Sequence, residues 1–332
     1  MPQSLLTAMI ISCSILLFYS VTGGIIASVY TDMVQGAIMI VAAILVFITV
    51  VFTFDNGLLE MNQIVYEDDR SAIGPWGTLG MFGSLSWLLL FGLGGAGQPH
   101  VITKLMMNKK ISDMRHILPI SIMGYVFSGL LWVGIGLAMR ALVINGMHPP
   151  LESPDQAASQ FLQHYAHPLL AGVVFAGLFA AIMSTAEAFL SIGTAAVMHD
   201  IPQAFGKKVR KPLTTARLTT IALTLLAAVF ALNSGDLIAL IGAMSWGVFA
   251  AAVVPVVTLG FNWKRANAFS ANVAIVSSLI VHFSFKVMNW HLPYRIDIGA
   301  FTLIFSLTIF VLLSFLTPQQ KLDPAVERVM DM

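Results

Sequence analysis

Charged side chains are scarce in this chain. Asp, Glu, Lys and Arg make up 10% of its 332 residues, whereas soluble domains contain roughly 25%. Hydrophobic residues reach 58%, and the formal net charge is +1. Such a chain cannot cover itself with a solvated surface, so we predict an all-α, polytopic protein whose surroundings are the lipid bilayer. The near-neutral charge gives no reason to expect a nucleic-acid partner.

Cysteine and catalytic motifs are also missing. The single cysteine, Cys13, excludes an intrachain disulfide and a cysteine-based metal site. The eight histidines show no metal-ligand spacing such as HExxH, and no GxSxG nucleophile motif occurs. An intramembrane aspartyl protease would need paired acids and a GxGD motif, which is absent. We therefore expect neither an enzyme nor an organic cofactor.

Long hydrophobic runs dominate the chain. A helical span needs roughly 20 apolar residues at about 1.5 Å each to cross the bilayer core. Hydropathy predicts about nine transmembrane helices within a single domain, residues 1–332, that ends in a short cytoplasmic tail, residues 317–332. The expected spans are residues 5–22, 25–54, 78–98, 115–142, 168–199, 214–233, 236–260, 267–288 and 296–316.

The charges sort with these spans when the N-terminus is placed outside. Only four of the 17 basic residues then lie outside, namely Arg70, Arg140, Lys286 and Arg295. The acidic residues lean the other way, with Asp55, Glu60, Glu67, Asp68, Asp69, Glu152, Asp155, Asp236 and Asp297 outside. Because basic residues favour the cytoplasmic side, this predicts a multi-pass protein of the plasma membrane (the bacterial inner membrane) with a cytoplasmic C-terminus. Ser153 followed by Pro154 predicts a short helix in an outer loop.

The fifth span, around residues 173–200, carries a cluster of oxygens near its middle. Ala181, Ser184 and Thr185 share one helical face with Ala188. Hydroxyl and carbonyl oxygens are the ligands that a hard cation such as sodium needs when it sheds water. The alternative is that the two hydroxyls only bond back to the carbonyl three or four residues earlier. Glu187 favours the functional interpretation, because packing does not require a carboxylate at that depth.

Two other features of the spans are candidates. Asp32 lies near the inner side of the second span, where it either serves an ion pathway or reaches out to interfacial water. The third span contains four glycines followed by Pro99, in the sequence FGLGGAGQPH. Such a run predicts either a broken helix that lines a cavity or close packing against a neighbouring helix.

Taken in order, several motifs make the chain resemble the sodium:solute symporter family, which contains proline, pantothenate, sialic acid and sodium–glucose carriers. The resemblance covers essentially the whole chain. It rests on TDMVQG (31–36), GQPH (97–100), AAIMST (180–185), MHDI (198–201), SWGVFAAAVVPV (245–256) and NWKRANAFSA (262–271). It implies a LeuT-type inverted-repeat fold in partial form, because the chain begins at the family's fifth helix and about four helices have no counterpart.

The resemblance also implies roles for individual residues. Sodium is expected at Ala181, through its carbonyl, and at Ser184 and Thr185, through their hydroxyls. Asp32 matches an aspartate on the inner pathway, and Glu187 replaces a hydroxyl of the family's second sodium site, so these two carboxylates form a possible second ion or proton pathway.

The substrate pocket is expected at Phe91, Gly94, Gly95 and Trp246. Proline carriers present a Trp and a Tyr where this chain has Phe91 and Gly95, which argues against proline as the solute. The implied function is sodium-coupled symport of a small organic solute, carboxylate-, amino-acid- or vitamin-like, by alternating access. If the chain is truly truncated, we expect it to be inactive alone, and the alternatives are a membrane sensor domain and a non-transporting remnant.

Overall fold

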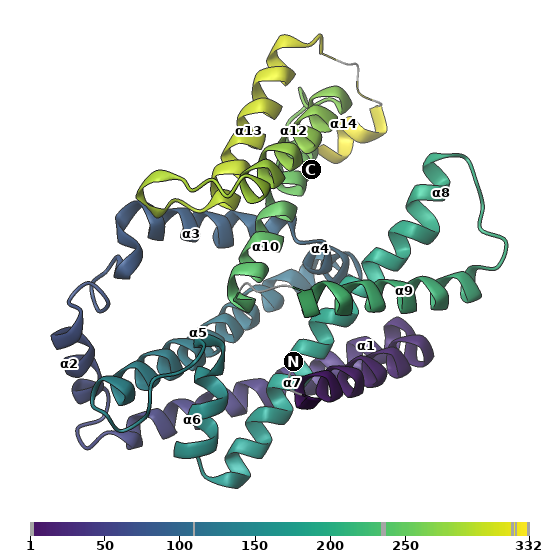
Figure 1. Cartoon of the computed structure of the whole chain (residues 1–332). Coiled ribbons are helices and arrows are strands. Elements are labelled where there is room, and N and C mark those ends of the chain that lie inside the picture. The colour runs from purple at the N-terminus through teal and green to yellow at the C-terminus, as the bar shows by residue number, and fades with distance from the viewer. Residues whose placement is uncertain (1–2, 109, 234–236, 320–321, 323, 331–332) are drawn as a thin grey trace. The chain divides into compact units, whose positions relative to one another are not determined.

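The computed structural model describes residues 3–108, 110–233, 237–319, 322 and 324–330. These residues form helices and turns and contain no strand (Figure 1), so the prediction of an all-α chain is confirmed. The helices are α1 (Gln3–Thr53), α2 (Leu58–Asp68), α3 (Gly80–Gly94), α4 (Pro99–Met106), α5 (Met114–Ile144), α6 (Ala157–Tyr165), α7 (Pro168–Ala195), α8 (Ile201–Ala204), α9 (Pro212–Asn233), α10 (Ile238–Val254), α11 (Gly260–Asn262), α12 (Ala268–Val287), α13 (Ile298–Leu316) and α14 (Pro324–Met330).

Eight helical segments in the described part of the chain are long and apolar enough to cross a membrane, and Leu6–Thr22 is a shorter apolar stretch. The first two expected spans are not separated: α1 runs without interruption from Gln3 to Thr53. The sequence between Thr22 and Tyr30 has two glycines but no proline or charged residue, and glycine weakens a helix without ending it. A helix of 51 residues is roughly 76 Å long, more than twice the thickness of a bilayer core.

Short turns of other helix types connect the long helices. Turns of 3₁₀ helix occupy Gly77–Leu79, Gly95–Gly97, Ile111–Asp113, Pro154–Gln156 and Pro293–Arg295. Turns of π helix, at Ala196–Asp200 and Pro255–Leu259, extend α7 and α10. The helix predicted after Ser153 is confirmed, whereas its place on the outer side stays a prediction. The Ser153 hydroxyl accepts a hydrogen bond from the Asp155 N–H at 3.3 Å and so caps the turn that leads into α6.

The chain divides into two compact units. Unit 1 comprises residues 1–65 and 110–235, and unit 2 comprises residues 66–109 and 236–332. The single domain predicted over residues 1–332 stays a prediction. Asp236, and parts of the tail at 317–332, lie outside the described residues.

Unit 1 is built on the second half of α1, which packs against both α5 and α7. Ala42, Ala43, Val46 and Val50 form a buried stripe along α1. Gly177 allows α7 to approach this stripe, because a Cβ there would already touch the Ala42 methyl at 3.8 Å. Helix α9 packs on α7, and the hydroxyl groups of Thr194 and Thr220 are 3.0 Å apart across that contact.

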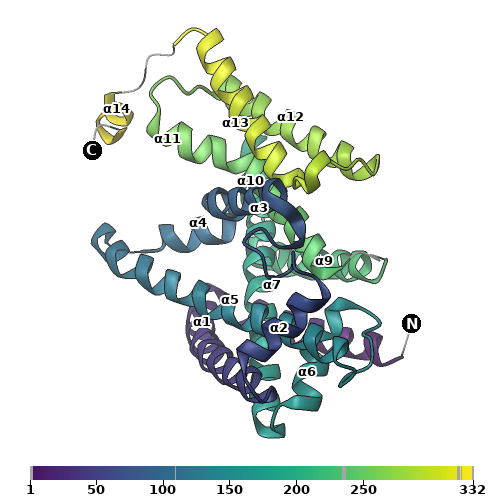
Figure 2. The ribbon, with the colours of Figure 1, turned by 90° about the vertical axis from the view of Figure 1, so that its left-hand side faces the viewer.

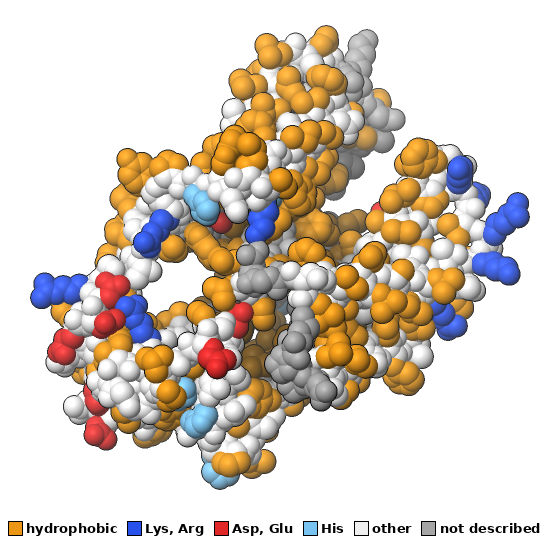
Figure 3. All heavy atoms as spheres, viewed as in Figure 1, with side chains coloured by type: hydrophobic (Ala, Val, Ile, Leu, Met, Phe, Trp, Pro, Cys, Tyr) orange, Lys and Arg blue, Asp and Glu red, His pale blue; other side chains and the backbone are white. Residues whose placement is uncertain are grey.

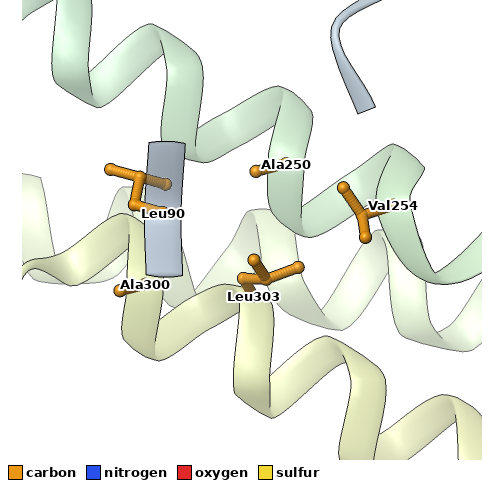
Figure 4. Close-up of a cluster of buried hydrophobic side chains, with 5 residues drawn as sticks. All are labelled: Leu90, Ala250, Val254, Ala300 and Leu303. Carbon is orange, nitrogen blue, oxygen red and sulfur yellow. The ribbon is translucent and has the colours of Figure 1, made fainter. Parts of the chain in front are cut away.

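Unit 2 has its core between α3, α10 and α13. Figure 4 shows Leu90, Ala250, Val254, Ala300 and Leu303 meeting there, and Trp246 packs against the same cluster. Helices α12 and α13 lie side by side in both ribbon views (Figures 1 and 2). The core therefore fixes the position of the α10 segment that carries Trp246.

Two glycines bring α10 and α13 into backbone contact. A Cβ on Gly247 would lie 2.6 Å from the Gly299 Cα and 3.0 Å from Cε1 of the buried His282 ring. Side-chain Cβ atoms do not approach backbone so closely, so both positions need glycine for this helix pair to pack.

The loop before α13 is tied to α3 by polar contacts. The Asp297 N–H donates to the buried Ser86 hydroxyl at 2.9 Å, and the Arg295 guanidinium donates to the Thr78 carbonyl. The Asp297 carboxylate caps α13 by accepting from the Ala300 N–H at 3.0 Å. Burial raises the pKa of the Asp297 carboxyl above its usual range and outweighs the opposing effect of the Ala300 and Gly299 N–H groups.

Figure 3 shows apolar side chains spread over much of the visible surface. Among the apolar side chains of the chain, Phe18, Phe52 and Leu88 are at least 70% exposed. A surface of this kind suits lipid or further protein rather than water. Within unit 1, Lys207, Lys208, Arg210 and Lys211 lie in the segment between α8 and α9.

The glycine contact predicts a matched pair of substitutions on α10. Gly247→Ala should lower the free energy of unfolding by about 1–3 kcal/mol, because the added methyl group meets the backbone of α13. Gly242→Ala, on the same helix with nothing within 4 Å of the added Cβ, should leave stability unchanged or raise it. Thermal unfolding in detergent measures both, and equal behaviour of the two variants would contradict the contact.

The buried cap of α13 predicts a pH effect. Because the pKa of Asp297 is raised in the folded state, its ionisation costs stability as the pH rises from the unfolded pKa through the folded one. Asp297→Asn keeps an acceptor for the Ala300 N–H and removes the charge. The Tm of this variant should equal or exceed that of the unmodified chain at pH 8, and the difference should shrink towards pH 4. A Tm that falls at pH 8 but not at pH 4 would show that the charge is stabilising instead.

Candidate functional site

Three oxygens of α7 converge within one helical turn. The Ser184 Oγ lies 3.0 Å and the Thr185 Oγ1 3.1 Å from the Ala181 carbonyl oxygen, to which both hydroxyls donate. The back-bonding alternative is therefore realised, and the hydroxyls are satisfied without an ion. The same geometry gathers three neutral oxygens whose hydroxyl protons can rotate away from a cation. The structure thus brings the three predicted sodium ligands together, while ion binding stays a prediction.

Glu187 lies on the next turn of α7 and is only 3% exposed. Tyr19 of α1 reaches it: the phenol donates to the Met183 carbonyl at 3.0 Å and is hydrogen-bonded with the Glu187 side chain. Asp32, which is half-buried, also acts electrostatically on this phenol. The two predicted carboxylates therefore share a neighbourhood around Tyr19.

Sequence reasoning missed Tyr19. The available signal was a tyrosine inside the first apolar run, since an aromatic residue with a polar tip is usually hydrogen-bonded when it is buried. Its partner could not be inferred, because 164 residues separate it from Met183.

The third predicted span is broken in unit 2. Helix α3 ends at Gly94, Gly95–Gly97 form a 3₁₀ turn, Gln98 is extended (φ −77°, ψ 115°), and α4 begins at Pro99. Close packing is present as well. A Cβ on Gly94 would lie 2.9 Å from the Trp246 Nε1, and one on Gly97 would lie 2.7 Å from the Val254 side chain. The helix is broken and closely packed at once, and Gly97 takes part in both. That the break lines a cavity stays a prediction.

Gln98 is a second residue that sequence reasoning missed. Its side chain is completely buried and donates from Nε2 to two carbonyl oxygens, that of Gly94 at 3.1 Å and that of Trp246 at 3.2 Å. A broken helix leaves backbone groups that need partners at membrane depth, and this amide supplies a donor and joins α3 to α10. The signal was an amide side chain directly before a proline in an apolar span.

The four predicted substrate-pocket residues lie together beside this break. The rings of Phe91 and Trp246 are 5.5 Å apart between centroids. The indole of Trp246 packs against Gly94 and Gly95, and a Cβ on Gly95 would come within 4.0 Å of the indole ring. His100, at the start of α4, lies edge-on to Trp246 at 6.3 Å. The arrangement offers an apolar, aromatic surface with an indole N–H and nearby helix ends, which suits a small organic molecule.

The oxygens of α7 belong to unit 1, and the aromatic surface belongs to unit 2. Within the described residues, no group of three or more His, Cys, Asp or Glu side chains is arranged to hold a metal ion. The predicted sodium ligands are instead a carbonyl and two hydroxyl groups.

The chain matches the profile of the sodium:solute symporter family over residues 2–278. Relatives include the osmoregulated proline transporter OpuE of Bacillus subtilis, 27% identical over 276 residues, a match that covers 80% of this chain and 54% of the relative. The sodium/pantothenate symporter of Haemophilus influenzae is 27% identical over 287 residues (82% and 58%), and the sodium/proline symporter of Staphylococcus aureus is 29% identical over 287 residues (82% and 54%). The chain spans about half the length of these curated relatives.

A solved structure shares the fold. It is the substrate-bound outward-open state of a Na+-coupled sialic acid symporter, with a TM-score of 0.69 and 20% sequence identity over 94% of this chain and 67% of that one. The likeness confirms the expected LeuT-type fold. From the profile match over most of its length, we conclude that this chain is a multi-pass membrane protein and belongs to the sodium:solute symporter family.

Proposed function

We propose that this chain takes part in sodium-coupled symport of a small organic solute by alternating access. The family and the named symporters among its relatives support the class of activity. The observation that carries the proposal for this chain is the convergence of the Ala181, Ser184 and Thr185 oxygens on one turn of α7. Sodium is the coupling ion in this proposal, and no organic cofactor is needed.

The coupling step follows from differential binding. Sodium held by the Ala181 carbonyl and the two hydroxyls favours the outward-open conformation, because a ligand shifts an equilibrium only towards the state that it binds more tightly. The carboxyl groups of Asp32 and Glu187, which both act electrostatically on Tyr19, provide in this proposal a second station for an ion or a proton on the inner part of the path.

The solute binds in this proposal at the break between α3 and α4. Phe91 and Trp246 supply apolar contact, and the indole of Trp246 is held directly against Gly94 at the end of α3. Broken helices at substrate sites are a recurring device of secondary transporters, since their ends present partial charges to the solute. A carboxylate-bearing, amino-acid-like or vitamin-like solute fits this surface.

The protein is further proposed to lie in the plasma membrane of a bacterium, with the N-terminus outside and the C-terminus in the cytoplasm. The sorting of basic and acidic residues supports this orientation. The named relatives come from bacteria.

The sodium site predicts the effect of a double substitution. Ser184→Ala together with Thr185→Ala should raise the sodium concentration for half-maximal response at least tenfold, because two of three chain ligands are lost and each 1.4 kcal/mol is about tenfold. The readouts are sodium-dependent thermal stabilisation in detergent and sodium-dependent uptake of L-proline, pantothenate or sialic acid into proteoliposomes. Ser191→Ala, on the same helix, is the control. An unchanged sodium dependence in the double variant would refute the assignment.

The solute site predicts a contrast between two glycines of α3. Gly94→Ala places a methyl group 2.9 Å from the Trp246 Nε1, so the indole must move, and the KM for the solute should rise about tenfold or more at an unchanged sodium dependence. Gly92→Ala, which meets nothing within 4 Å, should behave like the unmodified chain. If both variants fold and neither changes KM, the solute binds elsewhere.

A further inference from the structure

A cavity lies in unit 2, beside the part of α3 that precedes the break. Its volume is about 320 Å³, within the usual range for a site that holds a small molecule. It is enclosed by α3, α10, α12, the start of α13 and the loop between the last two. The residues used below are Trp87, Phe285, Lys286, Trp290 and Asp297.

Outside the membrane spans or at their ends, the cavity is lined by one carboxylate and one lysine, together with His291. Asp297 caps α13, and within the described part of the chain its hydrogen bonds come from backbone N–H groups, with no ion pair to a basic side chain. Lys286, in the last turn of α12, lines the same cavity. A pocket with both signs of charge is complementary to a molecule that also carries both.

Aromatic rings form a further part of the wall. Phe285 and Trp290 meet edge to face at 5.7 Å, and Trp87 of α3 lines the same cavity. Indole faces attract cationic groups, quaternary ammonium groups included. The acid and the rings together therefore favour the cationic end of a ligand, and the lysine favours its anionic end.

The wall of this cavity is held in place by the loop before α13. Asn289, Tyr294 and Arg295 all have positive φ, near +55°, a conformation that costs energy for residues other than glycine. The Arg295 contact to Thr78 fastens this loop to the 3₁₀ turn before α3, and the Asp297 contact to Ser86 fastens it to α3 itself. A loop held in such a conformation presents its side chains in one arrangement, which reduces the entropic cost of binding.

We propose that this cavity binds a small zwitterionic solute, with its ammonium group against Asp297 and the indole faces and its carboxylate at Lys286. An aromatic path joins the cavity to the proposed substrate surface. The Trp87 and Phe91 rings are 5.5 Å apart, and the Phe91 and Trp246 rings are again 5.5 Å apart. The cavity is then an outer station for the solute; that role in transport rests on the proposed function, whereas binding to the cavity does not.

The test uses glycine betaine as the probe, with the purified chain in detergent and in sodium-free potassium buffer. Titration calorimetry measures the affinity, and quenching of tryptophan fluorescence reports on Trp87 and Trp290. Saturable binding is expected, with choline and acetate, which each carry one of the two charges, at least about tenfold weaker.

Charge-removing variants locate the probe. Lys286→Gln and Asp297→Asn should each weaken betaine binding about tenfold, and Asn retains the helix cap, so folding is preserved. The control is Lys264→Gln, which removes an exposed lysine paired with Glu327 at 3.4 Å outside the cavity and should change nothing. Absence of saturable binding, or equal binding by both cavity variants and the unmodified chain, overturns the proposal.

The Ser184→Ala and Thr185→Ala double variant separates the two sites. It should bind betaine normally without sodium. If betaine binding requires sodium and is lost in the double variant, the probe occupies the transport site and the cavity assignment is wrong. If betaine binds as expected but the double variant leaves sodium-dependent uptake intact, the sodium-site proposal fails and the cavity stands.

Discussion

The close approach of α10 to α3 and α13 is the contact on which unit 2 depends. Gly247 and Gly299 let two backbones touch, and Gly94 and Gly97 let α3 and the turn after it pack under Trp246 and Val254. In lipid, the hydrophobic effect contributes little to the association of helices. Van der Waals contact between closely packed small residues must stabilise the association instead. The proposed substrate surface and the cavity beside Asp297 both lie against helix α10, whose position these contacts set.

Polar atoms at membrane depth explain much of the remaining architecture. Where α3 breaks, the buried Gln98 amide donates to two backbone carbonyls, so the irregular segment remains tolerable. On α7, the Ala181 carbonyl accepts from both hydroxyls of the candidate sodium turn. In the proposed sodium site, the same carbonyl would be one of the ligands. The Tyr19 hydroxyl likewise donates to a backbone carbonyl, that of Met183, and so joins α1 to α7 beside Glu187.

Several features could be predicted from the sequence, because they depend on local pattern. The helical class follows from composition and hydropathy. The glycine content indicated a break near Pro99 as one of two alternatives. The cap at Ser153 follows from its position before a proline. The separation of the first two spans was predicted wrongly, since α1 continues through that region. Two glycines, with no proline or charged residue beside them, raise the free energy of the helix too little to end it where the flanking segments are both apolar.

The sequence by itself determined that this chain is a polytopic helical protein of the symporter family, and it identified which oxygens share a turn of α7. Those properties need only helical periodicity and the transfer cost of charged groups into lipid. Only the tertiary structure decided that Tyr19 reaches Glu187, that Gln98 joins α3 to α10, and that α12, α13 and α3 enclose an aromatic cavity. These contacts connect residues far apart along the chain, and the packing of helices against one another, rather than any local propensity, determines which of them meet.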